Sequence, residues 1–103
     1  MGRPILSSET ERRVALLFHP DQQDIVRIIL LEECANNLPL LKDCDEVAID
    51  RLRFAALKLS DGNVEKLRSA VNLAKTDWRD LLVAAGFARD INAHKSWLPE
   101  QRW

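Results

Sequence analysis

The side chains of this sequence that bind metal ions most readily are two histidines and two cysteines: His19, Cys34, Cys44 and His94. Zinc sites in small proteins place such ligands in close pairs along the chain, because paired ligands share one turn or loop. In this sequence the four residues are scattered and form no such pair. We therefore predict that the chain has no metal site and carries no metal cofactor.

The two thiols are candidates for nucleophilic or redox chemistry. Cys44 lies in the first turn of a predicted helix, where the helix dipole favours the reactive thiolate. Asp43, Asp45 and Glu46 surround it, and their negative charges disfavour the same thiolate. Cys34 lies near the end of the preceding predicted helix and suits a packing role. We predict that neither thiol is catalytic.

Carboxylates suited to acid–base catalysis fall into two clusters, Glu32 with Glu33, and Asp43, Asp45, Glu46 and Asp50. Each cluster lies at a predicted helix end or on a helix face, whereas catalysis requires carboxylates that converge in a cleft. The three glycines are isolated, which excludes a glycine-rich phosphate loop. We therefore predict no catalytic and no cofactor-binding residue, and a small enzyme of unrecognised type is kept only as an alternative.

Start and stop signals predict five helices, with room for a short sixth. Ser8 is the expected N-cap of a helix over about 9–17, because Glu11 three residues later completes a capping box. Pro20 is expected to start the second helix, where its missing N–H costs nothing, and the asparagines at 36–37 to end it. The aliphatic residues of this second helix predict one broad apolar face made of Ile25, Ile28, Ile29 and Leu31.

The third predicted helix, over about 44–59, has Asp43 as its N-cap and Glu46 three residues later. It carries apolar residues on two nearly opposite sides. One stripe holds Ala48, Leu52, Ala55, Ala56 and Leu59, and the other holds Val47 and Phe54. A helix that is apolar on two sides packs against neighbours on both. We therefore predict that this helix is the centre of the fold.

Apolar residues recur at helical spacing throughout 64–85, so a single long helix fits this pattern. Thr76 and Asp77, however, are better helix caps than helix-interior residues. We therefore prefer two helices that meet at this pair, with Trp78 on the buried face of the second.

The second helix of this pair is expected to end at Gly86 in the left-handed conformation, with Phe87 folding back toward Leu82. Its exposed positions are predicted to hold one base, one acid and two apolar groups, namely Arg79, Asp80, Val83 and Ala84. Such a face reads base edges poorly, and a pI near 6.1 argues in the same direction. Nucleic-acid binding by a regulator is therefore an alternative and not our leading hypothesis.

The block "RLRFAALKLSDGNVEKLRSAVNLAKTDWRDLLVAAGF", residues 51–87, resembles a group of small bacterial helical proteins with a similar "ALKLS-G" and "DWRDLLVAAGF" arrangement. That group is tied to no known activity. The resemblance implies a bacterial source and a complete small protein. It implies no functional residues, and it does not extend to the N-terminal third or to the chain after Phe87.

Charge is distributed unevenly along the 103 residues, although the net charge is only −1. Residues 21–50 hold eight acids and two bases, giving −6, whereas residues 51–103 hold ten bases and six acids, giving +4. The acidic third is expected to attract a basic partner, although solvated helix faces explain the same charges. Trp97 and Trp103 near the C-terminus are expected either to pack on their own domain or to bind a partner. The candidate partner-binding residues are Glu32, Glu33, Asp43, Asp45, Glu46, Asp50, Trp97 and Trp103.

These features together predict an all-α fold, a compact single-domain bundle of four to six helices with its central helix near 44–59. The domain spans 1–103, with 1–7 and 98–103 as loose tails. No apolar run is long enough for a signal peptide or a membrane helix, so we expect a cytoplasmic protein with reduced thiols. The leading hypothesis is a protein–protein interaction module of the immunity, antitoxin or regulatory-subunit type, without a cofactor. Self-association is left open.

Overall fold

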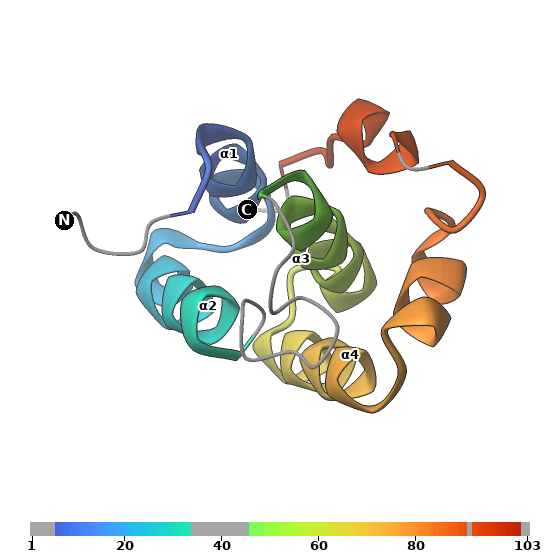
Figure 1. The fold of residues 1–103 in the computed structure, drawn as a ribbon. Helices are drawn as coiled ribbons and strands as arrows, with labels where there is room; N and C mark the ends of the chain where they lie inside the picture. Colours follow the sequence, from blue (N-terminus) through green and yellow to red (C-terminus); the bar gives the residue numbers. More distant parts are fainter. Residues whose placement is uncertain (1–5, 34–45, 91, 102–103) are drawn as a thin grey trace, which may run out of the picture.

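The fold of this protein is all-helical. The computed structural model describes residues 6–33, 46–90 and 92–101, and no strand occurs within these ranges. Its elements are α1 (Ser8–Leu17), α2 (Pro20–Glu33), α3 (Glu46–Ser60), α4 (Val64–Ala85) and a short 3-10 helix, η1 (Ala93–Ser96) (Figure 1). The Cα radius of gyration is 12.4 Å, close to the ~13 Å expected for a compact domain of this length. The predicted all-α class is therefore confirmed.

The N-cap of α1 is Ser7, one residue before the predicted Ser8. Ser7 has extended backbone angles, and its hydroxyl oxygen accepts a hydrogen bond from the backbone N–H of Thr10 at 3.2 Å. Two adjacent serines are equally suited to this role, and the tertiary bond of Thr10 to α3 selects the first. The expected capping box with Glu11 was wrong, because its carboxylate instead accepts from Arg27 Nε on α2 at 2.6 Å.

α2 begins at Pro20, as predicted. Arg27 joins it to α1 through Glu11 and also donates to Asp24 on its own helix at 2.9 Å. The hydrogen bond to Glu11 is the main reason that the pKa of Arg27 is raised above its ordinary value. A raised guanidinium pKa means that the favourable interaction is present at neutral pH and is lost only in strongly alkaline solution. The predicted end of this helix lies outside the described residues.

α3 contributes a continuous buried segment that comprises every residue from 52 to 57. The helix packs most extensively against α4 and also contacts α1 and η1. The predicted N-cap, Asp43, and the two cysteines, Cys34 and Cys44, lie outside the described residues. The buried core draws at least one residue from each of the four helices: Val14, Val26, Leu30, Leu57, Leu67 and Leu81.

α4 is interrupted at Asp77, whose backbone angles of −154° and 98° are not helical. The Asp77 carboxylate accepts a hydrogen bond from the backbone N–H of Arg79 at 3.0 Å, so it caps the segment that follows. The predicted break between two helical segments is therefore confirmed. Trp78, directly after the break, is only half-buried against the core, whereas Leu81 and Leu82 are fully buried.

The C-terminal end of α4 is closed by backbone bonds and by cations from α3. Gly86 adopts a left-handed conformation at φ 80°, and the N–H of Phe87 donates to the Leu82 carbonyl at 2.9 Å, as predicted. Arg51 donates to the Phe87 carbonyl at 2.7 Å, and Lys58 donates to the Ala85 carbonyl at 2.8 Å. These carbonyls at the negative end of the helix therefore receive positively charged donors.

We predict that Gly86→Ala lowers the free energy of unfolding by about 1–2 kcal/mol, because an alanine is strained at a positive φ. A Cβ at this position would meet only Lys58 Nζ, at an ordinary contact distance of 3.8 Å, so the backbone is the source of the loss. Gly86→Asn should lose less, since asparagine tolerates the left-handed region. Urea unfolding of the three proteins measures the difference. Equal stability of the alanine and glycine proteins would contradict this account of the helix end.

Candidate functional site

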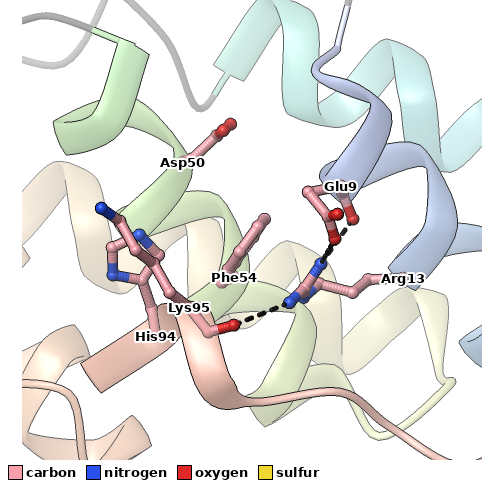
Figure 2. Close-up of a pocket in the computed structure, with 6 residues that line it drawn as sticks. All are labelled: Glu9, Arg13, Asp50, Phe54, His94 and Lys95. Carbon is pink, nitrogen blue, oxygen red and sulfur yellow. Dashed lines mark hydrogen bonds and ion pairs between the residues drawn. The ribbon is translucent and has the colours of Figure 1, made fainter. Parts of the chain in front are cut away.

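A pocket opens between α1, α3 and η1 and is lined by Glu9, Arg13, Asp50, Phe54, His94 and Lys95 (Figure 2). Its volume of about 340 Å³ lies at the lower end of the range for small-ligand sites. The lining contains acids, bases and an imidazole, the residue types from which catalytic sites are built. The bonds that these groups already make decide what the pocket can do.

Arg13 is the most heavily bonded residue of the pocket, and its side chain is only 3% exposed. Its Nε and one terminal nitrogen donate to the Trp97 carbonyl at 3.0 and 2.7 Å. The same terminal nitrogen reaches the Lys95 carbonyl at 3.5 Å, and the other donates to the Glu9 carbonyl and carboxylate at 2.8 and 2.9 Å. A guanidinium has five N–H donors, and these bonds use all of them. Arg13 therefore cannot bind a ligand without giving up one of these internal bonds.

Aromatic rings enclose this guanidinium. Its central carbon lies 4.0 Å from the centroid of the Phe54 ring and 5.9 Å from that of Trp97. The Phe54 ring meets the buried His94 ring edge to face at 5.3 Å, and Phe87 packs beside both His94 and Trp97. We call these five residues, Arg13, Phe54, Phe87, His94 and Trp97, the C-terminal clasp. The clasp holds η1 and the chain after it against α1 and α3.

A second polar connection ties α1 to α3 at the rim of the pocket. The Thr10 hydroxyl is fully buried and donates to the Asp50 carboxylate at 3.0 Å. Since its only proton is used in that bond, the 2.8 Å contact with the Ser7 hydroxyl must have Ser7 as donor. Asp50 is therefore engaged inside the fold, and the pocket has the properties of a structural junction.

The predicted partner-binding residues differ in their exposure and in their contacts. Glu32 is exposed on α2, whereas Asp50 is half-buried and accepts the Thr10 hydroxyl. Trp97 is half-buried in the clasp, so it packs on its own domain. The remaining candidates, or their side chains, lie outside the described residues: Glu33, Asp43, Asp45, Glu46 and Trp103. Of the described candidates, only Glu32 is exposed to solvent.

Sequence reasoning missed a surface on α2. The structure buries Val26, Ile29 and Leu30, while Ile25 and Ile28 remain 37% and 48% exposed. The expected single apolar face of this helix was therefore wrong, because the helix packs along a narrower line than its aliphatic content suggests. The exposed isoleucines are flanked along the helix by acids at spacings of four and seven residues. We call this surface the α2 stripe, and it consists of Asp21, Asp24, Ile25, Ile28 and Glu32.

A second surface lies along the C-terminal half of α4, where a shallow hollow of about 300 Å³ forms against α3. We call it the α4 groove, and its lining consists of Arg51, Trp78, Arg79, Leu82, Val83 and Ala88. The Arg79 guanidinium carbon lies 5.6 Å from the Trp78 ring centroid, and Val83 is 65% exposed. Arg79, Asp80, Val83 and Ala84 are all exposed, as predicted.

Metal and membrane chemistry receive no support from the described residues. No group of three or more His, Cys, Asp or Glu side chains lies close enough there to hold a metal ion. Each described helix is too short or too polar to cross a lipid bilayer. Comparison of the chain with protein-family models, with curated proteins and with solved structures finds no match.

We predict that Arg13→Met lowers the free energy of unfolding by about 2–4 kcal/mol, because it leaves partly buried carbonyls without their charged donor. Methionine retains much of the apolar contact with Phe54, so the loss reports the hydrogen bonds. The variant should also be cut faster by trypsin after Lys95, since the clasp no longer holds that segment. Urea unfolding and a timed trypsin digest measure the two effects.

Arg12→Met is the matched control, because Arg12 is an exposed neighbour on the same helix. It should change stability by no more than about 0.5 kcal/mol. Arg13→Lys should resemble Arg13→Met, since one ammonium group cannot reproduce the forked geometry. Similar stability for the Arg12 and Arg13 variants would mean that the clasp does not stabilise the fold.

Proposed function

We propose that this protein is a protein–protein interaction module whose binding surface is the α2 stripe. The observation that carries the proposal is the pairing of exposed isoleucines with acids on one helix face. Ile25 and Ile28 are adjacent on the helix surface and remain exposed, although the same helix buries three other aliphatic residues. Asp21 and Asp24 extend into solvent with 88% and 92% of their side chains exposed.

The chemistry of the stripe specifies the kind of partner. Apolar side chains at i and i+3, continued by an acid at i+7, suit a partner that offers aliphatic or aromatic groups beside positive charge. The acids would increase the rate of encounter with such a partner, and the isoleucines would supply buried apolar contact. An immunity protein, an antitoxin or a regulatory subunit of a cytoplasmic assembly works by this type of recognition.

The fold supports this role by fixing α2 from behind. Arg27 joins α2 to Glu11 of α1, and Val26, Ile29 and Leu30 pack into the core. A helix held in this way presents its outer face with little loss of conformational freedom on binding. We propose further that α3 is the hub of the bundle, on the basis of its contacts with α1, α4 and η1. The pocket of Figure 2 gives weaker support to an enzymatic function. Its Arg13 and Asp50 side chains are engaged in internal bonds.

We predict that Ile28→Lys weakens partner binding at least tenfold, since it removes an apolar contact and places a cation within the acidic stripe. The measurement is capture by the tagged full-length protein from an extract of its native cell, with the bound proteins quantified by mass spectrometry. The amount of partner retained should also fall as salt is raised, because screening weakens the acidic attraction.

Ser69→Lys is the matched control, since it adds the same charge at an exposed position on the N-terminal half of α4. Both variants should unfold within about 0.5 kcal/mol of the unmodified protein, because both positions are exposed. If Ile28→Lys and Ser69→Lys capture the same proteins in the same amounts, the α2 stripe is not the binding surface.

A further inference from the structure

The α2 stripe and the α4 groove have opposite chemistry. The α2 stripe combines isoleucines with Asp21, Asp24 and Glu32, whereas the α4 groove combines an indole and a valine with Arg51 and Arg79. We infer that the α4 groove of one copy receives the α2 stripe of a second copy, so that the protein associates with itself head to tail. This inference rests on the proposed function of the α2 stripe and names its partner.

The α4 groove is built to receive an acidic and aliphatic surface. The Arg51 side chain lies in its wall, where Nε is buried and has no hydrogen-bond partner in the described part of the chain. A buried donor without an acceptor is unfavourable, so a shift of the Arg51 side chain that lets a carboxylate in the groove accept from this N–H relieves the deficit. Arg79 is exposed at the rim and supplies a second positive charge.

The apolar parts of the two surfaces also correspond. Val83 is 65% exposed, Trp78 is half-buried, and the buried Leu82 also lines the groove. An isoleucine side chain from α2 is of a size that this hollow accommodates. Asp80 lies beside Arg79 and reduces the net positive charge there, so the apolar contact must carry part of the binding.

The two surfaces cannot meet within one molecule. In Figure 1 α2 lies on the left of the fold, and the C-terminal half of α4, in orange, lies on the right. Because the surfaces differ, the contact is heterologous, and a pair of copies keeps one stripe and one groove free for further copies. Each surface consists of no more than six residues, fewer than the ~20–30 residues per side of a standard stable interface, so the association is weak and depends on protein concentration.

The first experiment is sedimentation equilibrium of the unmodified full-length protein over a series of concentrations. At low salt the average mass should rise above the 11.8 kDa of one chain as concentration increases. At high salt it should return toward 11.8 kDa, because ions screen the carboxylates from the arginines. A mass of one chain at every concentration and salt level would overturn the inference.

The decisive experiment uses two variants, each with one surface blocked. Ile28→Lys places a cation in the stripe and leaves the groove intact. Val83→Glu fills the groove with an acid, four residues from Arg79, and leaves the stripe intact. Each variant alone should bind itself at least tenfold more weakly than the unmodified protein. An equimolar mixture should form dimers of one copy of each variant and nothing larger, because only one stripe and one groove remain.

Ser69→Lys and Ser69→Glu are the charge-matched controls and should associate like the unmodified protein. Circular dichroism melting of all four variants confirms that each is folded before its mass is interpreted. A mixture that stays monomeric, or single variants that associate as strongly as the unmodified protein, would overturn the head-to-tail contact. If the protein is monomeric but loses a captured partner in Ile28→Lys, this inference fails while the proposed function of the stripe stands.

Discussion

The break in α4 at Asp77 is the constraint on which the arrangement of the C-terminal third depends. An uninterrupted helix would carry residues 78–85 straight on from the first segment, along one line. The capped restart at Asp77 instead aligns the second segment so that Ala85 and Phe87 meet cations of α3. Phe87 in turn packs on His94 and Trp97, which brings the Trp97 carbonyl to Arg13. The contacts that lead from α4 through α3 and the C-terminal segment to Arg13 on α1 thus depend on the hydrogen bond that the Asp77 carboxylate accepts.

Features set by neighbouring residues were predictable from the sequence. Pro20, Asp77 and Gly86 each mark a helix end or break, because the proline ring, the capping carboxylate and the missing Cβ act within a few residues. The all-α class followed from composition and apolar spacing in the same way. The sequence did not distinguish Ser7 from Ser8 as the N-cap of α1, because either serine can cap a helix. We attribute the difference to the tertiary hydrogen bond of Thr10.

Features set by distant residues were not predictable. Nothing around Arg13 in sequence separates it from Arg12, yet one is buried and the other exposed, because the acceptor of Arg13 is a carbonyl 84 residues away. The sequence also did not show which isoleucines of α2 are buried and which are exposed, because this depends on how the neighbouring helices pack against α2. The sequence showed that residues 21–50 are acidic, but it did not show which of these carboxylates are exposed. Asp50 accepts a hydrogen bond from Thr10 inside the fold, whereas Glu32 faces solvent. The charge pattern therefore identified the acidic segment, but the packing of the helices determines which of its carboxylates are bonded inside the fold and which are exposed.

The long sequence separation between Arg13 and Trp97 has a consequence for how the protein is made. Chains are synthesised from the N-terminus at roughly 5–20 residues per second, so Arg13 precedes its acceptor by about 4–17 s. Throughout this interval the guanidinium has no Trp97 carbonyl to bind, and burial of Arg13 beside Phe54 without that acceptor is unfavourable. The junction of α1 with α3 therefore reaches its final state only after the ribosome has added residue 97. Formation of the C-terminal clasp consequently follows the synthesis of Arg13 by at least this interval, however early the individual helices form.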